Sequence, residues 1–177
     1  MSSEGSARPT RDRLYISFLA VHAIATIAID VQPIAPAALI PTLFKNLMNF
    51  YQSVSNDPLM IGASSGDPKY LWFRWFLAHE FIFFLPAYVF GIRGLLRDDP
   101  AIYPLLLAYG AAATTTTATC LVDLCFGSDS MSLTTEQFIL LLSSYVPFFL
   151  IPLIILIDMY LRIATLLKAA SKKHKTT

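Results

Sequence analysis

Charged side chains are scarce in this sequence, and their scarcity is its most informative feature. Only 14% of the 177 residues are Asp, Glu, Lys or Arg, whereas apolar residues make up 55%. A soluble domain carries about 25% charged residues, because its surface needs charges that a lipid-facing surface excludes. The composition therefore predicts an integral membrane protein. The net charge of +1 leaves no overall field that would attract a nucleic acid.

Cysteine and histidine are also sparse, which argues against metal and redox sites. On a helix, Cys120 and Cys125 would point about 140° apart, a poor geometry for a disulfide. No CxxC pair occurs, and the three histidines are scattered along the chain. We therefore expect no metal and no cofactor, with both cysteines serving as small apolar core residues.

Long apolar runs are what the sequence has in abundance. Four of them approach the ~20 residues that cross a bilayer, namely 14–31, 70–92, 101–122 and 138–161. Backbone groups in lipid must bond within their own segment, so each run is expected to be a helix. The predicted fold class is all-α, an integral membrane four-helix bundle. The proline-rich segment 32–69 is not one helix, although 43–51 could form an amphipathic helix that lies on the membrane or caps the bundle.

Basic residues gather on one side of this predicted bundle. Ten of the thirteen Lys and Arg residues precede the first run, separate the second from the third, or follow the fourth. By the positive-inside rule, both termini are expected in the cytosol. The predicted organisation is a cytosolic segment over 1–13, a four-span membrane domain over 14–161 and a basic cytosolic tail over 162–177. Lys173 and Lys175 match the dilysine pattern that returns proteins to the endoplasmic reticulum, and a plain membrane-surface patch is the alternative.

Ionisable residues at membrane depth are costly, by ~2.5–3.5 kcal/mol on insertion scales, and they indicate function. Asp158 and Arg162 are expected to form an interfacial ion pair one helical turn apart. His22 is expected at mid-span, either bonded to a facing helix or in contact with a ligand. His79 and Glu80 are adjacent and point about 100° apart, so at most one of them faces the bundle centre.

Asp30 and Glu80 form the candidate site. Both are expected in the non-cytosolic half of the bilayer, where helix tilt could bring them together. Two carboxylates in an apolar pocket would share one proton and keep one negative charge, which suits an amine or a sterol hydroxyl. Alternatively, water or backbone satisfies each carboxylate separately. The surrounding wall is expected to be apolar and aromatic, with Phe73, Phe76, Leu77, Tyr145 and Phe148.

Several short stretches occur in a characteristic order, namely His22 with AIDVQ at 28–32, NDPL at 56–59, Glu80 with LP at 85–86, DPAI at 99–102 and SYVP at 144–147. Together they resemble the sigma-2 receptor (sigma intracellular receptor 2) family of the EXPERA group, which also holds the emopamil-binding sterol isomerases. The resemblance runs over about 14–161, so the predicted membrane domain is EXPERA-like.

The resemblance implies a four-helix protein of the endoplasmic reticulum, often a homodimer, that binds sterols, oxysterols and cationic amphiphiles. By the same resemblance, Asp30 takes a ligand ammonium, Glu80 hydrogen-bonds to Asp30, and Asp57 is a loop carboxylate needed for the folded site. One departure concerns sterol preference, because Phe84 stands where the family has a Gln linked to oxysterol recognition.

Three functions remain open at this point. The first is a lipid-binding receptor that assists sterol and lipid homeostasis without catalysis. The second is a sterol double-bond isomerase, which would need acid and base groups at both ends of a sterol; those isomerases carry a fifth span, and the sequence offers four. The third is a scaffold that aids membrane or mitochondrial protein targeting, as some fungal relatives in this family suggest.

Overall fold

The computed structural model describes residues 10–175, and all regular structure in this part of the chain is helical. Four helical stretches are long and apolar enough to cross a membrane, which confirms the predicted fold class. These spans are Thr10–Asp30, Pro68–Leu96, Pro100–Phe126 and Thr135–His174. Residues 1–9, with most of the predicted N-terminal segment, and residues 176–177 lie outside the described residues.

Two of the spans change their helical pitch along the way. The first consists of α1 (Thr10–Ala25) and a π-helical turn at Thr26–Asp30. The second comprises a 3-10 turn and three further helical pieces, namely Pro68–Tyr70, α4 (Leu71–His79), the π-helical turn Glu80–Phe84 and α5 (Leu85–Leu96). The predicted spans are therefore interrupted by local irregularities that their apolar patterns do not reveal.

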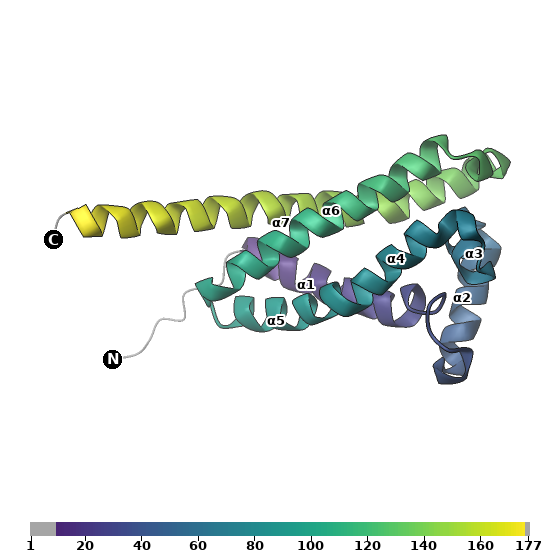
Figure 1. Cartoon of the computed structure of the whole chain (residues 1–177), viewed down its shortest axis with the longest axis horizontal. Helices are drawn as coiled ribbons and strands as arrows, with labels where there is room; N and C mark the ends of the chain where they lie inside the picture. Colours follow the sequence, from purple (N-terminus) through teal and green to yellow (C-terminus); the bar gives the residue numbers. More distant parts are fainter. Residues whose placement is uncertain (1–9, 176–177) are drawn as a thin grey trace.

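The third and fourth spans are longer than the apolar runs indicate. The third consists of a 3-10 turn, Pro100–Ile102, and α6 (Tyr103–Phe126), while α7 runs over Thr135–Lys175 and continues through both of its prolines. The predicted tail is thus helical as far as Lys175, because Ala, Leu and Lys favour the helix beyond the membrane. In Figure 1, α7 extends past the other helices at the end where α1 begins.

The start of α1 lies beside α7 at one end of the bundle, which we call the terminal end (Figure 1). The expected ion pair is confirmed there, since Arg162 Nη2 lies 2.7 Å from Asp158 Oδ2. It belongs to a larger network, because Arg11 Nη1 lies 2.7 Å from Asp158 Oδ1 and Arg162 also pairs with Asp12. These contacts join residues far apart in sequence and hold the first span against the fourth.

Close helix packing also fixes the third and fourth spans. Gly110 on α6 lies directly against α7, where an added Cβ would sit 2.8 Å from Leu156 N and 2.9 Å from Pro152 O. Small residues of this kind let two helix backbones approach each other in a membrane bundle. The central hydrophobic core is formed by buried residues of all four spans, including Leu19, Tyr88 and Tyr109.

The segment between the first two spans folds at the opposite end of the bundle (Figure 1). It contains a 3-10 turn at Ala37–Leu39, then α2 (Thr42–Ser55) and α3 (Pro58–Ser65). The amphipathic helix predicted over 43–51 is confirmed as the longer α2. The sequence analysis missed α3, which begins at a proline that follows Asp57.

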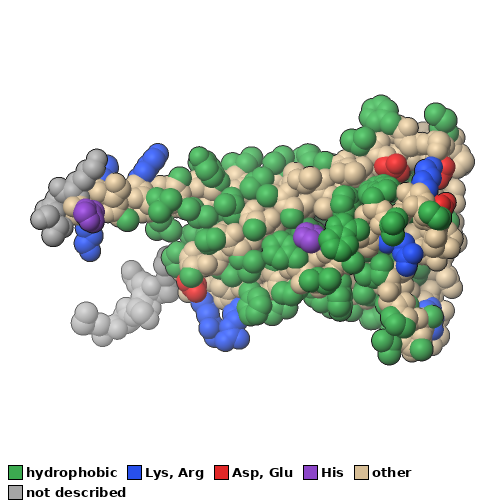
Figure 2. Space-filling view, in the orientation of Figure 1, with side chains coloured by type: hydrophobic (Ala, Val, Ile, Leu, Met, Phe, Trp, Pro, Cys, Tyr) green, Lys and Arg blue, Asp and Glu red, His purple; other side chains and the backbone are tan. Residues whose placement is uncertain are grey.

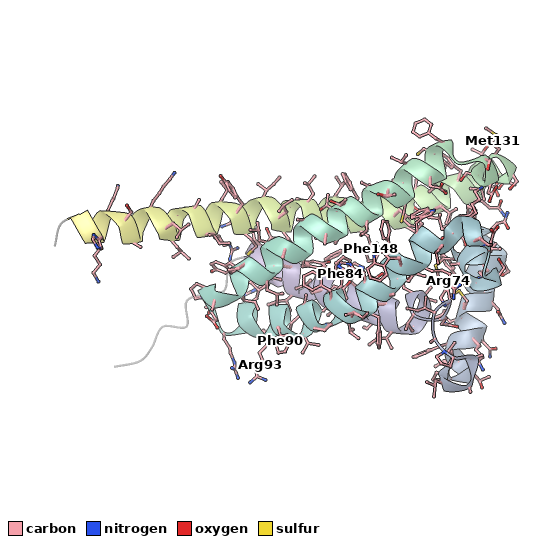
Figure 3. The ribbon with its side chains drawn as sticks, in the orientation of Figure 1. Arg74, Phe84, Phe90, Arg93, Met131 and Phe148 are labelled. Carbon is pink, nitrogen blue, oxygen red and sulfur yellow. The ribbon has the colours of Figure 1, made fainter. Side chains whose placement is uncertain are left out.

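Apolar side chains cover most of the visible middle of the bundle, whereas charged side chains gather near its two ends (Figure 2). Arg93 lies at the outer edge of the terminal end, and Arg74 lies toward the opposite end (Figure 3). The two cysteines are free, and Cys120 is buried as expected. The expectation is wrong for Cys125, which is exposed because it points to a different side of α6.

Candidate functional site

A cavity opens between the spans and the segment that joins the first two. It is lined by side chains from all four spans and from α2 and α3. All eight residues predicted to contact a ligand lie on its wall, namely His22, Asp30, Phe73, Phe76, Leu77, Glu80, Tyr145 and Phe148. The structure thus brings the predicted residues together, while their role in binding stays a prediction.

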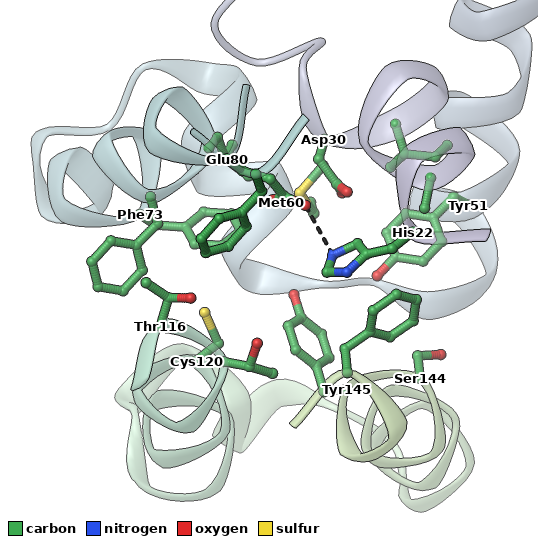
Figure 4. A pocket seen from close by; sticks show the side chains of 17 residues that line it. His22, Asp30, Tyr51, Met60, Phe73, Glu80, Thr116, Cys120, Ser144 and Tyr145 are labelled. Carbon is green, nitrogen blue, oxygen red and sulfur yellow. Dashed lines mark ion pairs between the residues drawn. The ribbon is translucent and has the colours of Figure 1, made fainter. Parts of the chain in front are cut away.

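The two acidic residues occupy similar backbone settings. Asp30 ends the π-helical turn of the first span, and Glu80 begins that of the second. A π-helical turn is rare, changes the direction of the side chains that follow, and often marks a functional site. In Figure 4, Asp30 and Glu80 enter the cavity from one side, and Cys120 and Tyr145 enter from the other. Both carboxylates line the one cavity, as the sequence analysis expected.

The partners of Glu80 are neutral or basic groups. His22 Nε2 lies 3.0 Å from Glu80 Oε1, and Thr26 Oγ1 donates to the same oxygen at 2.7 Å. Tyr88 donates a longer bond of 3.4 Å, while the other ring nitrogen of His22 lies 3.1 Å from the Tyr109 hydroxyl. His22 is therefore bonded to facing helices, as one of its two readings expected.

Asp30 differs from Glu80 in its surroundings. No hydrogen bond to its carboxylate is present within residues 10–175, and Glu80 is not bonded to it there. The Glu80–Asp30 hydrogen bond implied by the resemblance therefore stays a prediction. A carboxylate in an apolar setting is stabilised by a donor or a cation, so a ligand carrying either would find its partner in Asp30.

Asp57 is fully buried and organises the wall of the cavity nearest α2 and α3. Its Oδ1 accepts from the backbone N–H groups of Leu59 at 2.9 Å and Met60 at 3.4 Å, which caps α3. Its Oδ2 accepts from the hydroxyls of Tyr51 at 2.6 Å and Tyr145 at 2.9 Å. Both tyrosines line the cavity. The Asp57 carboxylate thus fixes the start of α3 and positions two tyrosines of the cavity wall.

Burial also affects the titration of this group. Burial raises the pKa of Asp57 above its ordinary value of 3.8, while the four hydrogen bonds that it accepts oppose the shift. Burial and the neighbouring Asp57 charge likewise raise the pKa of the Tyr51 hydroxyl. Tyr51 therefore remains a hydrogen-bond donor to Asp57 at any physiological pH.

Aromatic side chains close the remaining wall. Phe84 packs edge-on against Tyr109, with ring centroids 5.2 Å apart, and Figure 3 shows it near Phe148 between the helices. His79 packs against Phe84 at 4.9 Å and does not line the cavity. His79 and Glu80 therefore diverge as expected, and Glu80 is the one that faces the cavity.

Several residues of the site were missed by the sequence analysis. Thr26, Tyr88 and Tyr109 surround the His22–Glu80 pair, and Thr116 and Cys120 add to the cavity wall. Buried tyrosine hydroxyls usually need partners, but nothing in the sequence says which buried group each of them meets.

The comparisons with known proteins bear on this geometry. The family model EXPERA (EXPanded EBP superfamily) matches residues 43–159. The chain belongs to the EXPERA family. It is 30% identical over 155 residues to sigma intracellular receptor 2 of Macaca fascicularis, which covers 82% of this chain and 84% of the relative. The human protein of the same name is 29% identical over 147 residues, with 78% and 80% covered.

A fungal protein is also similar to this chain over nearly its whole length. The efficient mitochondria targeting-associated protein 19 of Schizosaccharomyces pombe is 25% identical over 168 residues, which covers 94% of this chain and 84% of that protein. The range matched by the EXPERA model includes Asp57, Glu80 and Tyr145. His22 and Asp30 precede it, so the cavity combines residues from inside and outside the matched range.

Proposed function

We propose that this EXPERA protein is a membrane receptor of the endoplasmic reticulum that binds sterols, oxysterols or cationic amphiphiles in its acidic cavity. Binding would assist intracellular sterol and lipid homeostasis. The observation that carries the proposal is Asp30, a carboxylate without a hydrogen-bond donor from residues 10–175, on the wall of a mostly apolar cavity. The similarity to proteins named sigma intracellular receptor 2 supports the same reading.

The wall suits an amphiphile with a compact polar end. Phe73, Phe76 and Leu77 present apolar surface along one helix, and Phe148 does so from another. Asp30 would pair with an ammonium or accept from a hydroxyl, whereas Glu80 is already bonded to His22 and Thr26. An apolar cavity with a few placed polar groups is the usual form of a small-molecule site.

The accompanying proposals concern location and assembly. Both termini would lie in the cytosol, since basic residues flank the terminal end of the bundle. Lys173 and Lys175 would act as a retrieval signal, and the protein would form a homodimer as the family resemblance implies. We also propose that the bound lipid is released unchanged, which is supported by the similarity to proteins named as receptors.

Mass spectrometry of lipid extracted from the purified protein tests the proposal. A sterol should be enriched in this extract relative to the total lipid of the membranes from which the protein was purified. Incubation of the protein with that sterol then separates binding from catalysis, since a receptor returns it unchanged and an isomerase shifts its double bond. Sterol content no higher than that of the source membranes would contradict a sterol site in the cavity.

A second candidate function is a scaffold role in protein targeting. It is favoured by the similarity to the Schizosaccharomyces pombe protein, which extends over 94% of this chain. Cells that lack the protein, complemented with either wild type or the D30N variant, discriminate the two roles. A targeting defect that D30N rescues as fully as wild type would support the scaffold, because recognition of a ligand charge by Asp30 would then be dispensable.

A further inference from the structure

Three sides of α2 have different chemical character. Met48 and Ser55 are buried and Phe44 and Tyr51 are half-buried, so this row at i, i+4, i+7 and i+11 packs on the bundle. At about 100° per residue, these four side chains fall on one face of the helix. The buried row is therefore the side of α2 that packs against the rest of the protein.

A second row on α2 is apolar and exposed. Its members are Leu43, Leu47, Phe50 and Val54, with 72%, 43%, 66% and 46% of each side chain exposed. They have the same i, i+4, i+7, i+11 spacing and lie about 100° around the helix from the buried row. This exposed apolar row touches no other part of the helix bundle closely enough to be buried.

The third side of α2 is polar. Lys45, Asn46, Asn49 and Ser53 are all exposed and lie about 120° from the exposed apolar row and about 140° from the buried row. A helix in the plane of a membrane interface needs an apolar side toward the acyl chains and a polar side toward water. An interfacial helix that also packs on a protein needs a third side to form that contact. The buried row of α2 supplies this side.

The depth of α2 can be read from its contacts. Met48 is buried in one cluster with Tyr70 and Phe73, and Trp72 packs against that cluster. Tyr70, Trp72 and Phe73 belong to the first turns of the second span. Trp and Tyr concentrate where a span enters the membrane interface. Gln32 Nε2 donates to the carbonyls of Ala28 and Phe44, which ties the start of α2 to the end of the first span.

The orientation of α2 agrees with this depth. Figure 1 shows α2 running crosswise to the spans, and therefore along the membrane plane, at the end opposite the terminal end. Apolar side chains project at this corner of the molecule beside a basic one (Figure 2). Arg74, a few residues into the second span, lies toward the same end of the molecule (Figure 3).

We propose that α2 is an interfacial helix whose exposed apolar row is embedded in the lipid leaflet opposite the terminal end. The occupant is the boundary between headgroups and acyl chains, and the polar side of α2 faces the aqueous compartment. This anchor is independent of the proposed ligand. It matters for the cavity because Tyr51, on the same helix, lines the cavity and donates to Asp57.

Accessibility of spin labels on α2 tests the proposal in phosphatidylcholine discs. Single cysteines would replace Leu47, Phe50, Asn49 or Ser53 in a background with C120A and C125S. At positions 47 and 50, oxygen, which concentrates in lipid, should relax the label more than a water-soluble nickel chelate does. At the matched positions 49 and 53, the chelate should be the stronger relaxant.

Two outcomes would overturn the lipid assignment. If the chelate dominates at all four positions, the exposed apolar row lies in water. If both relaxants are weak at 47 and 50 and the labels broaden each other, the row is covered by a second copy of the chain. The same variants allow a second measurement, because a water-soluble maleimide should react at least tenfold more slowly at 47 and 50 than at 49 and 53. Equal rates would also reject the proposal.

Discussion

His22 on the first span and Glu80 on the second meet with 3.0 Å between Nε2 and Oε1, and their side chains are only 8% and 13% exposed. His22 lies shortly before the π-helical turn of the first span, and Glu80 begins the π-helical turn of the second. Asp30 is the other carboxylate that lines the cavity. Removing one partner of a buried pair is far more costly than replacing both, because the remaining group keeps its desolvation penalty.

We therefore expect H22A to lower the free energy of unfolding by about 1–3 kcal/mol, because Glu80 Oε1 loses a buried hydrogen-bonding partner. The matched control is H79A, which loses only aromatic packing against Phe83 and Phe84. A double variant that removes both members of the pair, H22F with E80L, should recover part of the loss. Thermal melting of the purified proteins measures all three. Equal destabilisation by H22A and H79A would contradict a buried pair.

Asp57 supports a second prediction, on stability. D57A removes the cap of α3 and leaves two tyrosine hydroxyls without an acceptor, so it should cost several times the ~1 kcal/mol of an ordinary cap. D57N should be milder, since an Asn side chain can still accept from the backbone of α3. Melting of the two variants in parallel checks the order, and a D57N variant that is less stable than D57A would contradict it.

The pH dependence of D57N follows from the same site. The folded pKa of Asp57 is raised above 3.8, so the folded protein holds this proton more tightly than the unfolded chain does. The resulting stabilisation is complete below 3.8 and is lost as the pH rises through the raised value. Wild type should therefore lose stability relative to D57N between acidic and neutral pH. A constant difference would show that Asp57 titrates normally.

Much of this architecture was predictable because the relevant signals are local. The four apolar runs, the amphipathic α2 and the Asp158–Arg162 pair each depend on residues within one helix. Asp30 and Glu80 were identified because a carboxylate inside an apolar run is unusual whatever its partners are. The predicted ends of the helices were less accurate. The helix α7, for example, continues beyond its apolar run through polar residues that still favour a helix.

The remaining features depend on contacts between distant segments. Glu80 meets His22 and Thr26 of the first span, with Thr26 lying 54 residues away in sequence, and no sequence pattern specifies such a meeting. The π-helical turns depend on packing between spans and not on propensity. Asp57 was known only from a resemblance, and its bond to Tyr145 spans 88 positions. Local chemistry thus identified the ionisable groups, and tertiary packing decided their partners.

The topology gives a third prediction. A glycosylation acceptor inserted in the turn Ser128–Ser132 should be modified, and one appended after Thr177 should not. The reason is that ten of the thirteen basic residues belong to the sequence segments 1–13, 93–97 and 162–175, which the positive-inside rule assigns to the cytosol. Electrophoretic mobility before and after deglycosylation measures both. Modification of the C-terminal acceptor alone would reverse the orientation.

A fourth prediction concerns the dilysine pattern. Changing Lys173 and Lys175 to Ser should let the protein leave the endoplasmic reticulum. The control changes Lys168 and Lys172 to Ser, which removes the same charge from the helical tail but keeps the pattern. Microscopy and glycan processing of a tagged protein report the distribution. If both double variants behave alike, the tail acts as a basic membrane-surface patch.

The central claim is that Asp30 supplies the charge recognised in the cavity, while Glu80 positions the site through His22 and Thr26. D30N should weaken binding of a cationic amphiphile on the order of 100-fold, because a buried ammonium loses its counter-ion. E80Q should weaken it less, since the Gln amide oxygen can still accept from Thr26. An uncharged sterol should tolerate D30N better than the amine does.

The most direct measurement is equilibrium binding of a labelled cationic amphiphile and a labelled sterol to wild type, D30N and E80Q. Each variant must first melt cooperatively in the same detergent, so that loss of binding is not loss of fold. The account predicts that D30N weakens amine binding on the order of 100-fold, largely spares sterol binding, and weakens amine binding more than E80Q does. Intact amine binding by D30N, or an equal loss with E80Q, would contradict the role assigned to Asp30.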